Sequence, residues 1–468
     1  MTSTVGASSD VNNDYALVHK PNACRYFQFT DLGNAQTMVE RFGNNFLYCT
    51  TSKKWYFWNG KIWEKDTIQE IRRCAIRTVH YISSMAQEIN DDELSEKLRK
   101  WARTSENFQR QANMIKSAEP YLSVRNDEWD ADDNLFNTLT GTIELDTCTF
   151  REHRKEDRLT KMSGVAYNPE MKCPLWEEHL STVFDNDQEL IDAFQVMSGY
   201  TLLPVNPEQV FNILFGTGRN GKSVTMNVLS NIMGDYSVTV APQTLMVQRS
   251  SSGGPRSDVV RLEGARLITA SEGDAGDVLS EELIKRITGG DIITARPLYQ
   301  NEREFVAGGK VWFSTNHKPS ITSSGISIWR RVRLWPFDVA IPTEIVDPDM
   351  ENHLLAEKSG IFNWMLAGLQ IYLTKGLLNS SKVLTATKQY KEESDQIGRF
   401  IKDCCIQDSS TTTCKIARPD LREAYQVWCQ ETDEVQLTHK DFAKRLQEHG
   451  ITKPDGGNRY WGNIRLKI

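Results

Sequence analysis

The chain has 468 residues, 39% of them hydrophobic and 25% charged, which is ordinary for a globular protein of about two to four domains. Its formal net charge of −7 excludes a basic surface over the whole molecule, so any contact with nucleic acid must come from a local patch or channel. The sequence predicts a soluble, cytoplasmic protein with no membrane contact. Its start is polar and has no signal-peptide pattern, and its apolar run at 361–373 is too short to span a bilayer. Its nine cysteines contain no C-x-x-C pair, which favours reduced thiols.

Aromatic residues dominate the beginning of the first predicted domain. After a polar segment at 1–40, two aromatic runs lie around Asn59-Gly60, an arrangement typical of a β-hairpin. The rings could stack on nucleic-acid bases, but packing within a small sheet is the favoured interpretation. Residues 66–90 and 92–118 then carry helical patterns with charged polar faces.

Asp130 and Asp132 form a D-x-D pattern, which in polymerases and primases can hold two metal ions. Such carboxylates normally lie on a stiff apolar strand, whereas these lie in a predicted loop. A loop without metal chemistry is therefore favoured over a priming site.

A glycine-rich segment at 216–223 follows a predicted buried strand at 210–215 and precedes a predicted helix at 224–233. Its residues match the P-loop pattern G-x-x-x-x-G-K-[ST]: Gly216, Thr217, Gly218, Arg219, Asn220, Gly221, Lys222 and Ser223. In such a loop the backbone N–H groups surround phosphates, Lys222 reaches the β- and γ-phosphates, and the Ser223 hydroxyl binds Mg²⁺.

The same glycines also satisfy the dinucleotide-binding pattern G-x-G-x-x-G. That fold requires an acidic residue at the end of the next strand, about 20 residues further on. Asp235 lies near that distance, but it precedes the strand predicted at 237–240. Lys222 and Ser223 would also have no role there, so the P-loop is the favoured interpretation.

Polar residues end two further predicted strands. Glu272 ends the strand within 262–272, in the position where an acid holds Mg²⁺ or polarises water beside a P-loop. Asn316 ends the strand at 311–316. Between them, a helix is predicted at 281–288 and a hairpin at 292–306.

Two arginines, Arg330 and Arg331, lie between the apolar residues Trp329 and Leu334. A run of charge is usually a solvated face, but these apolar neighbours favour a packed, positioned site. Helical patterns follow at 349–375 and 380–400.

The C-terminal region has predicted helices at 419–430 and 439–449, a turn, and a strand at 459–466, which is the order of a winged helix. From position 435 to the end, seven Lys and Arg face three Asp and Glu, and this excess favours a nucleic-acid surface over a packing module. Phe442 and Leu446 are predicted to face inward, while Lys440, Lys444 and Arg445 are the predicted DNA contacts.

Five segments, taken in their order along the chain, resemble the superfamily 3 helicases: GTGRNGKS, RLITASE, KRITGGDIITARPLYQNEREF, VWFSTNHKP and WRRVRLWPF. The resemblance is closest to the helicase part of phage and plasmid primases and of the poxvirus primase-helicase, and it covers about 42–468. Two upstream segments resemble the accessory domain that precedes that motor: WDADDNLFNTLTGTIELDT and AYNPEMKCPLWEEHL. In the family, the loop that contains the D-x-D pattern carries no primase chemistry.

This resemblance implies an α/β fold, with an AAA+-type P-loop core, an N-terminal α+β accessory domain and a C-terminal winged helix. The expected parts are a polar segment at 1–40, the accessory domain at 41–165, the helicase core at 166–345, a helical connector at 346–395 and the winged helix at 396–468. No primase domain of its own is expected.

The resemblance also implies roles for the site residues. Lys222 and Ser223 would be Walker A, Glu272 the Walker B acid, and Asn316 the sensor-1 amide. Arg330 or Arg331 would be an arginine finger acting on the next subunit. Lys285 and the turn Gly289-Gly290-Asp291 lie in the family's additional motif. Ser271 stands where the wider AAA+ pattern has a second acid, so a single carboxylate must serve.

The implied function is ATP- and Mg²⁺-dependent unwinding of DNA by a ring, expected to be a hexamer of 3′→5′ polarity, for replication of a mobile element alongside a separate primase or polymerase. In the hairpin, Arg296 would meet phosphate and Tyr299 would stack on a base or sugar. The alternative for this hairpin is an ordinary surface element with Arg296 paired to Glu302 or Glu304. The alternatives for the chain are a slow P-loop switch without unwinding and a primase-helicase that still primes.

Overall fold

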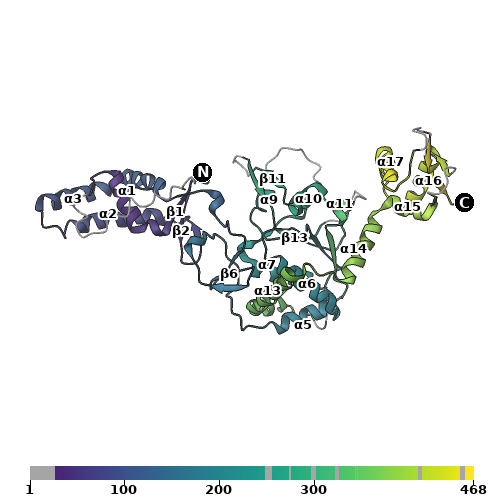
Figure 1. The fold of residues 1–468 in the computed structure, drawn as a ribbon, viewed down its shortest axis with the longest axis horizontal. Helices are drawn as coiled ribbons and strands as arrows, with labels where there is room; N and C mark the ends of the chain where they lie inside the picture. The colour runs from purple at the N-terminus through teal and green to yellow at the C-terminus, as the bar shows by residue number, and fades with distance from the viewer. Residues whose placement is uncertain are drawn as a thin grey trace, which may run out of the picture. The chain divides into compact units, whose positions relative to one another are not determined.

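The computed structural model describes residues 27–247, 256–273, 276–296, 302–321, 326–342, 344, 346–408, 414–453 and 459–467 (Figure 1). The chain divides into two compact units. The first contains Met1–Asp132 and His153–Lys161, and the second contains Asp133–Glu152 and Met162–Ile468. No helix in the described ranges is long and apolar enough to cross a membrane.

In its described residues, the first unit combines the helices α1 to α4 with a four-stranded sheet of order β3-β2-β1-β4. Its elements are α1 (Asp31–Phe42), β1 (Phe46–Cys49), β2 (Lys54–Trp58), β3 (Trp63–Lys65), α2 (Glu70–Met85), α3 (Asp92–Ser105), α4 (Phe108–Ala118) and β4 (Ser123–Val124). The predicted hairpin around Asn59-Gly60 is confirmed, because β2 and β3 pair antiparallel across it.

The aromatic rings of this sheet pack on one another, as expected. The Tyr48 and Trp55 rings lie 5.1 Å apart, and the Tyr56 and Trp129 rings lie 4.7 Å apart. The helical stretch predicted at 92–118 is divided in two, since the Asn107 side chain accepts a hydrogen bond from the Gln109 N–H and begins a new helix.

The second unit is built on a parallel sheet. Its helices are α5 (Pro174–Val183), α6 (Gln188–Tyr200), α7 (Lys222–Met233), α8 (Pro242–Leu245), α9 (Ser257–Val260), α10 (Glu281–Gly289), α11 (Ile326–Trp329), α12 (Met350–Ala356), α13 (Lys358–Lys375) and α14 (Ser381–Ser394). Its strands are β5 (Leu135–Asn137), β6 (Thr142–Glu144), β7 (Thr149–Arg151), β8 (Phe211–Phe215), β9 (Ser237–Thr239), β10 (Leu267–Ser271), β11 (Ile292–Ala295), β12 (Arg303–Val306), β13 (Lys310–Thr315) and β14 (Val332–Pro336).

Five of these strands form the central sheet in the order β14-β8-β13-β10-β9, and every pair in it is parallel. The mixed α/β fold expected from the sequence is confirmed. The dinucleotide-binding alternative is not supported, because β9, the next strand after β8, is separated from it by two strands instead of lying beside it. Strand β14 was not predicted, since the charged Arg333 interrupts its apolar pattern.

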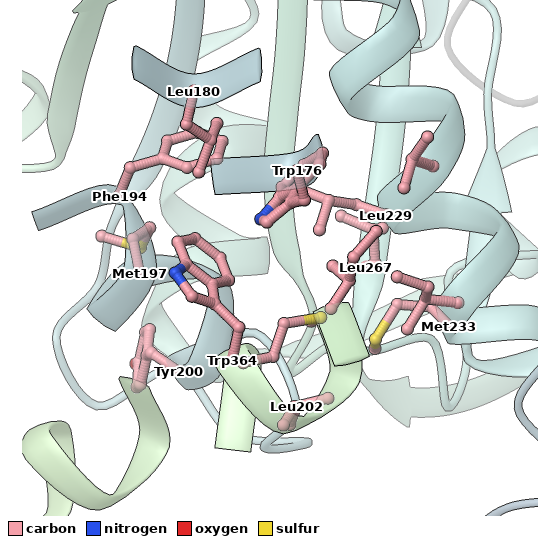
Figure 2. Packing of buried hydrophobic residues seen from close by; sticks show 14 of the residues in the cluster. Trp176, Leu180, Phe194, Met197, Tyr200, Leu202, Leu229, Met233, Leu267 and Trp364 are labelled. Atoms are coloured by element: carbon pink, nitrogen blue, oxygen red, sulfur yellow. The ribbon is translucent and has the colours of Figure 1, made fainter. Parts of the chain in front are cut away.

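Side chains alternate between the two faces of this sheet. Leu214, Leu267 and Trp312 join a cluster with the helices α5, α6, α7 and α13, and Figure 2 shows Trp176, Phe194 and Trp364 packed there. Their strand neighbours, such as Ile213 and Phe313, join a second cluster with α10 and the hairpin β11–β12. Both faces are covered, which is why the strands are almost continuously apolar.

The C-terminal region has its own hydrophobic cluster. Its elements are α15 (Gln396–Cys404), β15 (Cys405–Gln407), β16 (Lys415–Ala417), α16 (Arg418–Glu431), α17 (His439–Glu448), β17 (Tyr460–Gly462) and β18 (Ile464–Leu466). The two predicted helices are confirmed, and the Thr438 side chain caps α17 by accepting from the Asp441 N–H. The predicted strand is split at Asn463, which has a φ of 63°.

Candidate functional site

The loop at 216–223 leaves β8 and enters α7 through tightly packed glycines. A Cβ on Gly216 would lie 2.3 Å from the Phe337 carbonyl oxygen, and a Cβ on Gly221 would lie 2.5 Å from a Val183 methyl group. Gly221 also has a φ of 76°, which disfavours any side chain. The loop is therefore pressed against the core on one side, and its other side lines a cavity.

Lys222 connects this loop to the end of β13, the strand that lies beside β8 in the sheet. It is only 5% exposed, and its Nζ donates to the Gly216 oxygen at 2.7 Å, to Asn220 Oδ1 at 2.9 Å and to Asn316 Oδ1 at 3.2 Å. Burial lowers the pKa of Lys222 to about 8. The amine is therefore held in place by three oxygen atoms, and its charge is destabilised.

Glu272 and Asn316 follow β10 and β13, so both lie at the carboxyl edge of the sheet beside the loop. Glu272 is exposed and has a φ of 63°, a conformation that is costly for a side chain with a Cβ and that concentrates at functional sites. Its N–H donates to the Ser314 oxygen at 2.9 Å, which fixes the acid against β13.

A cavity of about 290 Å³ brings these groups together. Its lining contains Gly218, Arg219, Asn220, Gly221, Lys222, Ser223, Val224, Ser271, Glu272, Ser314, Thr315 and Asn316. A second cavity of about 440 Å³ shares Ser223, Ser271 and Ser314 and extends between α7 and strands β9 and β10. The predicted loop, acid and amide thus meet in one place.

The groups in this cavity fit a nucleoside triphosphate with Mg²⁺. The glycine cradle exposes backbone N–H groups at the start of α7, Lys222 supplies a cation, and Ser223 and Glu272 supply the oxygen ligands that Mg²⁺ prefers. Two protein ligands suffice where phosphate oxygens provide others. Within the described ranges, no group of three or more His, Cys, Asp or Glu side chains could hold a metal.

His179 was not anticipated and supports the loop from α5. The His179 ring packs against Gly221: a Cβ built on Gly221 would lie 3.1 Å from the ring carbon Cε1. The Thr225 hydroxyl donates to the Gly221 oxygen at 2.9 Å, so its own oxygen accepts from His179 Nε2, also at 2.9 Å. Burial lowers the pKa of His179 to about 4, which keeps the ring neutral. Only the packing of α5 under the loop reveals this role.

The two arginines after α11 differ in their surroundings. Arg331 is 7% exposed and donates to Thr288 Oγ1 at 3.0 Å and to the Ser327 oxygen at 2.6 Å. Burial lowers its pKa, as does the neighbouring Arg330. Arg330 is exposed and donates to Gln209 Oε1 at 2.8 Å. Only Arg330 therefore presents a guanidinium at the surface.

The predicted hairpin is confirmed as β11–β12, with Ile292 opposite Val306 and Ala295 opposite Arg303. Arg296 is exposed and makes no ion pair within the described ranges, so its alternative pairing with Glu302 or Glu304 is not observed. Tyr299 lies outside the described residues. In the segment where the sequence predicts an additional motif, Lys285 is paired with Glu281 at 3.1 Å, and Gly290 ends α10 with a φ of 72°.

In the C-terminal region, Phe442 and Leu446 are buried, as predicted. Lys440 and Lys444 are exposed and Arg445 is half-buried. Lys444 lies 3.9 Å from Glu448, a loose pair for two exposed groups. These three basic residues are far along the chain from the glycine-rich loop at 216–223.

Two family models match the chain. Residues 35–185 match the family described as D5 N terminal like, and residues 214–331 match a family of unknown function, DUF5906. The second match begins at the end of β8 and ends at Arg331, so it contains the whole lining of the smaller cavity.

Curated relatives come from large DNA viruses. "Putative helicase L207/L206" of Acanthamoeba polyphaga mimivirus is 27% identical over 64% of this chain and 33% of its own length. "Putative helicase 184R" of Invertebrate iridescent virus 6 is 24% identical over 74% of this chain and 40% of its own length. "Putative primase C962R" of African swine fever virus (strain Badajoz 1971 Vero-adapted) is 21% identical over 61% and 32%. The chain thus spans a third to two fifths of these relatives.

A solved structure has a similar fold. The A form apo structure of the NrS-1 C terminal region covers 89% of this chain and 96% of its own, with a TM-score of 0.52 and 12% sequence identity. At that identity the likeness concerns the fold alone.

Proposed function

We propose that the chain, which is similar to putative helicases and a putative primase of large DNA viruses, is an ATP-dependent DNA helicase. The observation that carries the proposal is the contact of Lys222 with Asn316 beside Glu272 in one cavity. A cation, an amide and an acid that follow three neighbouring parallel strands are the groups that hydrolysis of a γ-phosphate needs.

Each residue has a proposed role in hydrolysis. The loop N–H groups and Lys222 bind the phosphates, and Ser223 and Glu272 hold Mg²⁺, which would neutralise charge on the β- and γ-phosphate oxygens. Asn316 orients the attacking water, and Glu272 polarises it. Ser271, an exposed hydroxyl residue, precedes Glu272, so one carboxylate serves both purposes.

Arg330 is the proposed arginine finger. A finger must reach the phosphates of a neighbouring subunit, and an exposed guanidinium can do so, whereas Arg331 is engaged inside its own subunit. Hydrolysis would then occur between subunits of a ring, proposed to be a hexamer moving 3′→5′ along one DNA strand.

The strand order β14-β8-β13-β10-β9 supports an AAA+-type core, in which the P-loop strand lies between the sensor strand and the last strand. The helices α15 to α17 with two small antiparallel strand pairs support a winged helix with Lys440, Lys444 and Arg445 toward DNA. Arg296 and Tyr299 on the hairpin are the proposed grip on single-stranded DNA.

Priming by this chain is not favoured by the surroundings of Asp130. Its backbone has a φ of 49°, and its carboxylate accepts from the Thr160 N–H at 2.7 Å and from the Thr160 hydroxyl. The carboxylate thus holds a loop together, and a separate primase or polymerase would supply primers.

The test measures ATPase activity with and without single-stranded DNA. We expect DNA to stimulate hydrolysis, and Lys222→Ala to lower it by at least about a hundredfold, the scale of losing one key phosphate contact. Lys388→Ala, which removes an exposed lysine of α14, is the matched control and should act like the parent. ATPase that DNA leaves unchanged, in a protein that unwinds no fork, would favour a P-loop switch.

A further inference from the structure

A dense local excess of positive charge lies in the first unit, far from the glycine-rich loop in sequence. Residues 97–118 contain six Lys and Arg against one Glu, a net charge of +5 in a chain whose total is −7. These residues are the second half of α3 and the whole of α4. The acids of α3 gather instead at its start, where Asp91, Asp92, Glu93 and Glu96 lie.

The six cations are not equivalent. Lys97, Lys100, Arg110 and Lys116 form ion pairs with Glu93, Glu96, Asp31 and Glu119, at 2.6, 3.4, 3.1 and 2.7 Å. Arg99 and Arg103 are exposed and make no ion pair in the part of the chain that the structure describes. They are four residues apart on one helix, so they lie on the same face.

A polar cavity of about 570 Å³ adjoins this face. Its lining has no aliphatic or aromatic side chain and consists of Asp31, Arg103, Thr104, Asn107, Gln109, Arg110 and Asn113. Arg110 is held in place by Asp31 and by the Trp101 ring, 4.5 Å from its guanidinium carbon. Asn113 occupies the other Asp31 oxygen at 2.8 Å, so both oxygens of that acid are engaged.

An exposed aromatic ring stands at the start of α4. Phe108 is 61% exposed although it is a large apolar residue, and the Arg72 guanidinium lies 4.6 Å from its ring. Its two sequence neighbours, Asn107 and Gln109, both line the cavity. Guanidinium and amide donors beside an exposed ring are the groups that bind single-stranded nucleic acid without reading its sequence.

We propose that the surface formed by Arg99, Arg103, Phe108 and the adjoining cavity binds the backbone of single-stranded DNA, with one base on Phe108. Arg99 and Arg103 each contact a phosphate. This site lies outside the ATPase machinery and gives the first unit a role in holding DNA. It deepens the proposed function, because it takes DNA as the common ligand.

The test compares two variants of equal charge in the 468-residue chain. Arg99→Ala/Arg103→Ala removes the unpaired arginines, and Lys97→Ala/Lys100→Ala removes two paired lysines of the same helix. For a dT oligonucleotide, the arginine variant should bind roughly tenfold more weakly at low salt, and its log-log salt slope should fall by about 1.4, or about 0.7 per lost phosphate contact. The lysine variant should change both quantities less, and both should keep the parental DNA-free ATPase.

Two further measurements identify the ligand. Phe108→Ala should weaken oligonucleotide binding without changing the salt slope, and inorganic phosphate at constant ionic strength should not displace the oligonucleotide. Equal effects of the arginine and lysine pairs would overturn the site, as would displacement by phosphate or stronger binding of an acidic peptide than of DNA. If the parent protein binds no single-stranded DNA, the proposed helicase function itself is wrong. If the parent binds DNA but the arginine variant binds it with the parental affinity and salt slope, this site alone is wrong.

Discussion

The amine of Lys222 donates a hydrogen bond to the side-chain oxygen of Asn316 across 3.2 Å. Lys222 begins the helix after β8, and Asn316 directly follows the neighbouring strand β13, which pairs with β8 along its length. A group that enters between them must replace this bond, so phosphate binding and the position of Asn316 are mechanically connected.

The lowered pKa of Lys222 should make the proposed binding of nucleotide dependent on pH. Burial holds this pKa at about 8, and nearby phosphate charge would raise it. At pH 8 the free protein is therefore about half protonated at this site, and binding of ATP should take up about half a proton. Because protons are taken up, affinity for ATP should fall as pH rises above 8.

Calorimetry in buffers of different ionisation enthalpy measures this uptake. Lys222→Arg keeps a cation that does not titrate below about pH 12, so it should show no uptake from this site. The ATP phosphates also bind protons, and AMP, which has no β- or γ-phosphate for Lys222 to reach, corrects for the nucleotide. Equal proton uptake by the parent and Lys222→Arg would contradict the prediction.

Stability should depend on pH through His179. Its pKa is about 4 in the folded protein and about 6.5 when exposed, so the unfolded chain binds a proton first as pH falls. The free energy of unfolding is therefore unaffected by His179 above pH 6.5 and decreases between 6.5 and 4, by up to about 3 kcal/mol.

Denaturant unfolding at several pH values tests this with His179→Gln. Glutamine retains an N–H donor for Thr225 but does not titrate in this range. The variant should lose less stability than the parent between pH 6.5 and 4, while the carboxylates contribute alike to both. Parallel pH profiles would mean that His179 is protonated in the folded state or solvated.

Substitution of Arg330 should lower ATPase activity without changing stability, whereas substitution of Arg331 should lower stability. Arg330→Ala removes an exposed side chain, so stability should change by less than about 0.5 kcal/mol while ATPase falls by about 10³–10⁵. Arg331→Ala removes one buried and one partly buried hydrogen bond and should destabilise the fold by about 1–3 kcal/mol.

Mixing tests whether Arg330 acts on a neighbour. Inactive Arg330→Ala protein and inactive Lys222→Ala protein should together regain ATPase in mixed rings, since one interface can then have both groups intact. If subunits exchange but no mixture regains activity, hydrolysis between subunits is wrong.

The sequence predicts the glycine-rich loop, the strands β8, β9, β10 and β13 and the hairpin because these features are local. It does not predict β14, whose apolar pattern Arg333 interrupts, or the buried cations Arg266 and Lys310. Arg266 donates to the Leu202 and Leu135 oxygens at 2.6 and 2.7 Å, and these partners lie 64 and 131 residues away in sequence. From the sequence, a charged residue at the start of a strand is predicted to be exposed to solvent. Its burial becomes possible only because the folded chain brings distant backbone carbonyl groups to accept its hydrogen bonds.

The hairpin carries the last prediction, because one face of it is anchored and the other is open. Ile293, Ala295 and Phe305 are buried in the core, whereas Ile292 and Val306 are 61% and 52% exposed. After Val306 the chain turns through Gly308, where a Cβ would lie 1.7 Å from the Pro204 oxygen, and enters β13. This close packing leaves the connection little freedom to move independently of β13.

A displacement of Asn316 at the γ-phosphate would thus reach the hairpin along the stiff strand β13. Arg296→Ala/Tyr299→Ala should abolish stimulation of ATPase by DNA and strand separation together, while DNA-free ATPase and assembly stay at the parental level. Arg303→Ala is the matched control: it removes an arginine from the same hairpin, but one that is paired with Glu263 at 3.0 Å and so is not available to phosphate. If the control loses stimulation while the double variant unwinds forks at the parental rate, the grip lies on the Arg303 side, and coupling through Arg296 is wrong.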